Sequence, residues 1–110
     1  MLARLLDVYS VRQRVIAQNV ANVNTPRYHQ LDVDFEDAFG HALASHNAAD
    51  LKRLQPQVVE NATGPERADG NNVDIDFEMA RLTKNSLLYR TFVQIMASHV
   101  ATQRSAIAGQ

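Results

Sequence analysis

Apolar residues recur at alternating spacings of four and three along two long segments of the chain, as in a helix that packs against another helix. The first segment covers residues 2 to 23, and six of its seven recurring positions are apolar. These positions are Leu2, Leu6, Tyr9, Gln13, Ile16, Val20 and Val23. Because Pro26 disfavours helical geometry in the residue before it, we expect this helix to end by Thr25.

The second segment covers residues 74 to 107 and keeps the same spacing, with eight apolar residues in ten positions. The positions are Ile75, Met79, Leu82, Ser86, Tyr89, Val93, Met96, Val100, Gln103 and Ile107. A second apolar strip, formed by Leu88, Phe92, Ile95 and His99, runs beside them, and so wide a stripe indicates more than one neighbour. Asp74 is a suitable N-cap and Gly109 a natural stop, which predicts a helix about 50 Å long.

The middle of the chain has a different character, because all three prolines and three of the four glycines lie between residues 26 and 70. Leu31, Val33 and Phe35 alternate with aspartates, which predicts a short strand. Residues 36 to 46 favour a short helix, residues 57 to 60 a second strand, and residues 61 to 72 a loop. We expect this middle part to be partly mobile.

The predicted fold is mainly α, with the two terminal helices forming a coiled-coil-like hairpin around a loop-rich middle that contains short strands. We divide the chain into a helical unit, residues 1–25 with 74–108, and an irregular middle segment, residues 26–73. The shorter helix covers only part of the longer one, so apolar surface remains for other chains. The predicted assembly surface comprises Leu6, Tyr9, Ile16, Val20, Ile75, Met79, Leu82, Tyr89, Val93, Met96, Val100 and Ile107. A self-contained bundle would give a similar pattern, but no third strong helix is present to cover the remaining face.

Composition excludes several classes of function. The net charge of −1 gives no basic excess for nucleic acid, and no apolar run approaches the roughly 18 residues that a membrane span needs. The absence of cysteine excludes disulfides and thiolate metal sites. The first residues lack a basic head followed by an apolar core, so we expect no ordinary cleaved secretory signal.

Candidate chemistry is equally sparse, and we predict no catalytic residue, metal or cofactor. His41 and His46 are five residues apart, which separates them on a helix, and we interpret His99 as a core or interface residue. Residues 69–76 superficially resemble a calcium loop, but Asp74 stands where that loop needs glycine. Nothing in the sequence indicates general acid–base catalysis.

A polar run follows the first helix and carries the clearest motif. Asn19 and Asn22 share a helix face, where their amides can bond to another backbone or to the chain's own backbone. The run resembles the Asn-hydrophobic-Ala-Asn-x-x-Thr-Pro-Gly-Tyr signature of bacterial flagellar rod and hook proteins. The matching residues are Asn19, Val20, Ala21, Asn22, Thr25, Pro26 and Tyr28. Arg27 departs from the signature, and a turn that needs a positive φ there would be strained, so we expect a different local path.

A second block, from Asp69 to Ala80 and continuing through Tyr89 into a long helix, resembles the C-terminal region of proximal rod proteins of the flagellar basal body. The resemblance implies a structural subunit of the periplasmic rod that polymerises through its terminal helices and transmits torque. It also implies other rod and rod-base subunits, and further copies of the chain, as partners. Members of this family usually begin with a longer helix.

The same resemblance implies export by the flagellar type III apparatus without a cleaved signal. Phe35 and Phe39 are similar to the Phe-x-x-x-hydrophobic element read by the export gate, although they could equally pack against the helices. The alternative function is a small helical adaptor or export chaperone that binds one partner in the cytosol.

Overall fold

The fold is mainly helical, as the sequence predicts. The computed structural model describes residues 2–109, apart from the side chain of Leu2. Its elements in chain order are α1 (Leu2–Ala21), β1 (Leu31–Asp34), α2 (Glu36–Ala44), α3 (Ala48–Arg53), β2 (Gln57–Glu60) and α4 (Ile75–Ala108). Four of these six elements are helices, and the strands form one antiparallel pair that joins Leu31 to Glu60 and Asp34 to Gln57.

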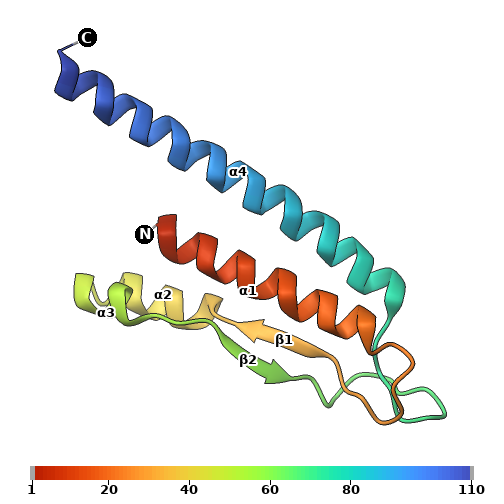
Figure 1. Cartoon of the computed structure of the whole chain (residues 1–110). Helices are drawn as coiled ribbons and strands as arrows, with labels where there is room; N and C mark the ends of the chain where they lie inside the picture. Colours follow the sequence, from red (N-terminus) through yellow and green to blue (C-terminus); the bar gives the residue numbers. More distant parts are fainter. Residues whose placement is uncertain (1, 110) are drawn as a thin grey trace.

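Three rows of secondary structure lie side by side, with α1 in the middle row (Figure 1). α4 runs antiparallel along one side of α1, while β1, β2, α2 and α3 line the other side. The Cα trace measures 65 × 29 × 14 Å, so the molecule is a thin plate. α1 therefore has a neighbour on both sides, whereas α4 is covered on one side only.

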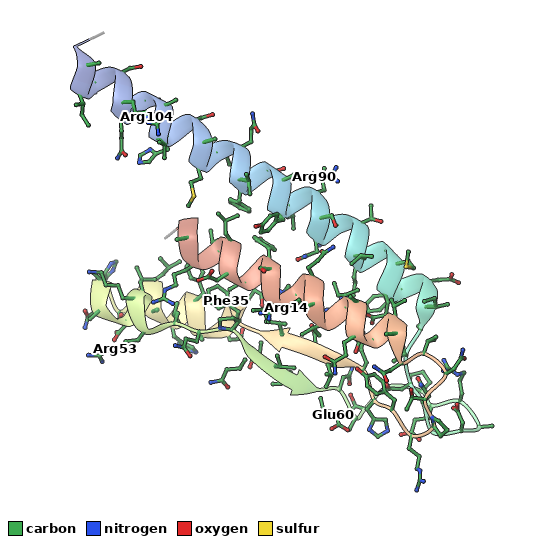
Figure 2. All side chains as sticks on the ribbon, in the orientation of Figure 1. Arg14, Phe35, Arg53, Glu60, Arg90 and Arg104 are labelled. Carbon is green, nitrogen blue, oxygen red and sulfur yellow. The ribbon has the colours of Figure 1, made fainter. Side chains whose placement is uncertain are left out.

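The apolar core lies between α1 and the strand row, not between the two long helices. Val8 and Val15 of α1 meet Val33 and Phe35, and Phe39 stacks on Phe35 with ring centroids 5.4 Å apart. Figure 2 shows Phe35 on the side of α1 that faces away from α4. Each fully buried side chain of this size stabilises the fold by roughly 1.5–3 kcal/mol, so these contacts hold the middle segment to α1.

Local chemistry sets the ends of α4 as predicted. The Asp74 side chain accepts hydrogen bonds from the backbone N–H groups of Asp76 at 3.0 Å and Phe77 at 3.2 Å. At the other end Gly109 adopts a left-handed conformation with φ of 74° and closes the helix. These two residues satisfy backbone groups that a helix end otherwise leaves unpaired.

Three details differ from the sequence prediction. α1 ends at Ala21 rather than Val23, because the next residues form tighter turns in which Val23 N–H bonds to the carbonyl of Val20. α2 ends at Ala44 rather than residue 46, where His46 takes a positive φ of 53°. α3 was not predicted; Asn47 caps its first turn by accepting a hydrogen bond from Ala49 N–H.

Candidate functional site

The motif residues converge where the end of α1, the approach to β1, the loop before α4 and the first turns of α4 meet. We call this region the motif junction and define it by its central amides and carboxylate, Asn19, Gln30, Asn71, Asn72 and Glu78. Asn19, Asn71 and Glu78 are fully buried, and Gln30 is nearly so. Every buried side-chain nitrogen and oxygen among the described residues has a hydrogen-bond partner.

Asn19 joins three elements with one side chain. Its amide nitrogen donates to the Leu31 carbonyl at 2.8 Å and to Glu78 Oε2 at 3.1 Å. Its amide oxygen accepts from Leu31 N–H at 2.9 Å and from the Tyr28 hydroxyl at 3.0 Å. The edge of β1 that faces α1 is thereby paired by a side chain, and α1 is fixed to both β1 and α4.

Glu78 is the central acceptor of the motif junction. Besides Asn19, it accepts from the amide of Gln30 and from Arg81, whose Nη1 lies 3.3 Å from Oε1. Arg81 also donates to Asp32 of β1 at 2.6 Å. The cation that pairs with the buried Glu78 carboxylate is therefore held in place by a second carboxylate. A buried carboxylate requires such pairing, because an isolated charge is costly to remove from water.

Asn71 holds the loop before α4 against the end of α1. Its amide nitrogen donates to the carbonyls of Asn22 at 2.9 Å and Thr25 at 2.8 Å. Its amide oxygen accepts from Val73 N–H at 2.8 Å. The motif residue Asn22 in turn donates to the Gln18 carbonyl and accepts from the Thr25 hydroxyl, so it shapes the turn from within.

Arg27 occupies the position where the signature has glycine, and it adopts a positive φ of 62°. The expectation of a different local path is therefore wrong: the chain keeps a left-handed turn and tolerates the strain of an arginine in it. Arg27 N–H donates to the Asp69 carbonyl at 2.8 Å. Gly70 lies directly opposite, where a Cβ would come within 3.2 Å of the Arg27 side chain.

The remaining motif residues are distributed between buried and exposed positions. Tyr28 is half-buried, and burial raises the pKa of its hydroxyl, an effect to which the negative charge of Glu78 adds. Ala21, Thr25 and Pro26 are exposed. The structure thus brings Asn19, Asn22, Thr25 and Tyr28 into one network and leaves Ala21 and Pro26 on its surface.

A second polar layer joins α1 to α4 farther along the helices. The amide of Asn85, nearly buried, donates to the Tyr9 carbonyl and to Gln13 Oε1, both at 2.8 Å. Gln13 in turn donates to the Ser86 hydroxyl at 3.0 Å. The buried residues of α4 are Glu78 and Asn85, which are seven residues apart. Polar contacts therefore hold α4 against the rest of the subunit, while its apolar side chains remain at least partly exposed.

The apolar side of α4 is the other candidate site. Ile75, Met79, Tyr89, Val93, Val100 and Ile107 of the predicted assembly surface are all exposed, with Ile107 at 88%. Leu6, Tyr9, Val20, Leu82 and Met96 are half-buried. Ile16 is different: at 1% exposure it belongs to the interior of the subunit and presents no surface to another chain.

The C-terminal end of α4 extends past α1 and carries little charge. Phe92 stacks on Tyr9 at 5.4 Å, and Tyr9 lies seven residues after the start of α1, so α4 beyond about residue 99 runs past α1. Figure 1 shows this overhang clearly. Between Thr91 and Gly109 the sequence holds one formally charged residue, Arg104. His99, interpreted from the sequence as a core or interface residue, is exposed within the single subunit.

Sequence reasoning missed several residues of the motif junction. The apolar pattern does not single out Glu78, Gln30 lies just before the predicted strand, and Asn71 and Asn72 fall in the segment predicted as a loop. Two features of the sequence could have indicated these residues. The predicted loop contains two consecutive asparagines, and Glu78 directly precedes Met79, one of the recurring apolar positions. Among the described residues, no cluster of three or more potential ligands suits a metal ion, and no helix is long and apolar enough to cross a membrane.

Comparison with known proteins agrees with the resemblance. A family profile described as "Flagella basal body rod protein" matches residues 6–29, the stretch that ends α1 and forms the motif turn. The chain is 37% identical over 115 residues to the flagellar basal body rod protein FlgB of Borrelia hermsii, covering 87% of this chain and 84% of the relative. The chain belongs to the flagellar basal-body rod protein family. It is 31% identical to FlgB of Aeromonas hydrophila, covering 96% and 88% of the two chains, and 26% identical to FlgB of Bacillus subtilis, covering 98% and 91%.

Membership of the flagellar basal-body rod family identifies the chain as a structural rod subunit, similar to the FlgB proteins of the proximal rod. The alternative of a cytosolic adaptor or export chaperone finds no support in these relatives. The matched stretch contains the whole Asn19–Tyr28 motif, and Asn19 is the residue that this motif shares with the motif junction.

Proposed function

We propose that this rod subunit polymerises through its terminal helices and transmits torque without any catalytic role, with the apolar side of α4 as the principal contact. The observation that carries the proposal is the exposed apolar side of α4 between Val93 and Ile107, where valine and isoleucine side chains are accompanied by a single formal charge. A free-standing helix in water would need more polar residues around its circumference. Neighbouring rod subunits and further copies of this chain are the partners that such a helix fits.

The motif junction supports this function by fixing the direction of α4. A long helix transmits force only if its base is rigid, and the buried Asn19 and Glu78 clamp that base to α1 and β1. In this proposal residues 1–25 and 74–108 form the helical core of the rod, with residues 26–73 packed outside it. The subunit acts in the periplasmic part of the basal body after type III export without a cleaved signal.

The test is a charge placed on the exposed apolar side of α4. Val93 is 40% exposed, so Val93→Asp should leave the isolated subunit folded, whereas a contact with another subunit would bury an unpaired carboxylate at a cost of several kcal/mol. Gln94→Asp adds the same charge about 100° farther round the helix and is the matched control. In a strain lacking the native gene, we expect Val93→Asp to abolish motility and rod incorporation while Gln94→Asp retains both. Normal rods with Val93→Asp would refute the proposed contact.

We also propose that Phe35 and Phe39 form the element that the export gate reads before the chain folds. Phe35 is buried in the core of the folded subunit, so the gate would reach it only in an unfolded chain. Phe39→Ala should reduce secretion of the chain, whereas Leu54→Ala, which trims a residue packed on the same core, should reduce stability but not secretion. Equal secretion of the two variants would leave these phenylalanines a purely structural role.

A further inference from the structure

His29 lies between two carboxylates at the edge of the motif junction. Its Nδ1 is 2.7 Å from Glu60 Oε1, and its Nε2 is 2.8 Å from Glu66 Oε1. Glu60 is the last residue of β2, and Glu66 belongs to the loop between β2 and α4. Figure 2 shows Glu60 at the end of the sheet where the loops gather.

The geometry of these contacts favours a charged imidazole. A neutral ring donates from one nitrogen only and would turn a lone pair toward the second carboxylate, whereas the imidazolium ion donates from both nitrogens. Both ring nitrogens here lie at hydrogen-bonding distance from a carboxylate oxygen. The hydrogen bond to Glu60 is the largest influence on the pKa of His29, and together with Glu66 it raises that pKa despite partial desolvation.

The contact with Glu66 fastens the loop that supplies Asn71 and Asn72 to the motif junction. Next to Glu66, the guanidinium of Arg67 donates to the carbonyls of Val73 and Val23. Arg67 is thereby engaged with carbonyls and, at 4.0 Å, with Asp69. Glu60 from β2 and Glu66 from the loop are the charged groups in contact with the His29 ring within the described part of the chain.

We propose that His29, Glu60 and Glu66 form a proton-dependent clasp that closes the 61–74 loop over the motif junction. With His29 protonated, the ring bridges the strand end and the loop. When His29 loses its proton, the ring can donate to only one of the two carboxylates. The bridge between the end of β2 and the loop is then broken on one side.

The direction of the pH effect follows from the raised pKa. A group that binds its proton more tightly in the folded state stabilises that state fully at pH values below its unfolded pKa, here 6.5, and loses this contribution as the pH rises through the folded value. The clasp is therefore closed in mildly acidic solution and opens as the pH rises through the folded pKa of His29, which lies above 6.5. Each unit by which the pKa of His29 with the loop closed exceeds its pKa with the loop open changes the ratio of closed to open loop by about tenfold between acidic and basic solution.

Two measurements on the full chain test the clasp. The pH midpoint of the His29 ring signals in NMR should lie above 6.5, and Glu66→Gln should move it down, while Asp37→Asn, an exposed carboxylate on α2, should leave it unchanged. The second measurement is the rate of hydrogen exchange at the loop amides of Ala68 and Gly70. The rates in the wild-type chain and in the His29→Gln variant are compared at each pH, so that the intrinsic pH dependence of exchange cancels.

The expected result is slower loop exchange in the wild-type chain than in His29→Gln in acid, and convergence of the two above the His29 midpoint. The His29→Gln substitution removes the titrating group and keeps a hydrogen-bonding side chain, so the variant should remain folded. A His29 midpoint at or below 6.5, or a wild-type to variant ratio that does not change with pH, would overturn the proposal.

Discussion

Replacing the Asn19 amide by a carboxyl should convert the buried contact between Asn19 and Glu78 into a repulsion. Asn19→Asp preserves size and shape, but the atom that donates to the Leu31 carbonyl and to Glu78 Oε2 becomes an acceptor. Asn19 is fully buried, so water cannot relieve the conflict. The substitution therefore tests one proton-donating group with little change in packing.

The size of the effect can be worked from the contact distance. Two carboxylate charges about 4 Å apart repel by about 4 kcal/mol at an effective dielectric constant of about 20, and the lost hydrogen bond to Leu31 adds about 1 kcal/mol. The introduced carboxyl could instead take up a proton and donate a hydrogen bond again. Protonation at pH 7 costs about 4 kcal/mol, so the destabilisation caused by Asn19→Asp cannot exceed about this value. A loss of about 4 kcal/mol in the free energy of unfolding is a large part of the roughly 5–15 kcal/mol that stabilises a typical domain.

The penalty should shrink in acid, because the nearby carboxylate raises the pKa of the introduced group in the folded state. The destabilisation is largest above that raised pKa and falls by roughly 1.4 kcal/mol per pH unit toward the unfolded value of about 3.9. Urea unfolding followed by circular dichroism measures this directly. Asn24→Asp is the matched control, since Asn24 is exposed in the same segment. If the two variants were equally stable at neutral pH, or if their difference did not depend on pH, the assigned role of Asn19 would be wrong.

Two further substitutions probe the backbone around the motif junction. Gly70→Ala should lower the free energy of unfolding by about 1–2 kcal/mol, because Gly70 has a φ of 81° and its new Cβ would lie 3.2 Å from Arg27. Gly40→Ala is the control, since Gly40 lies in α2 and its new Cβ would meet open space. This variant should raise the free energy of unfolding by up to about 1 kcal/mol. Equal effects in denaturant titrations would contradict this account. Asp74→Ala should lower the free energy of unfolding by about 0.5–2 kcal/mol, because the N-cap of α4 is lost. Asp76→Ala removes only a charge near the same helix end and should lower it by about 0.3–1 kcal/mol. Thermal melts that rank Asp76→Ala as the more harmful change would argue against the cap.

The long helices and both strands could be predicted because their signals are local. The four-three spacing identified α1 and α4, and Asp74 and Gly109 fixed the ends of α4 through interactions within one helical turn. α3 escaped prediction because six residues are too few to show a period. The ends of α1 and α2 were missed by two residues each, which is the usual extent to which helix ends vary.

The motif junction could not be predicted, because its residues become neighbours only in the folded chain. Glu78 is 59 residues from Asn19 and 48 from Gln30, and neither separation carries a periodic signal. Ile16 was misplaced for a related reason: a helix with neighbours on both sides buries positions that a two-helix interpretation assigns to an outer surface. Arg27 shows the converse, since the surrounding hydrogen bonds impose a backbone angle that its residue type disfavours.

The Cα atoms of the plate span only 14 Å in its thinnest direction. A single layer removes little hydrocarbon from water when it folds, so the heat-capacity change on unfolding one molecule should be small for its length. The stability of a lone subunit then varies only gently with temperature. In the proposed assembly, the exposed apolar side of α4 is covered when subunits join, so the joining of subunits should carry a heat-capacity change of its own and respond to warming or cooling.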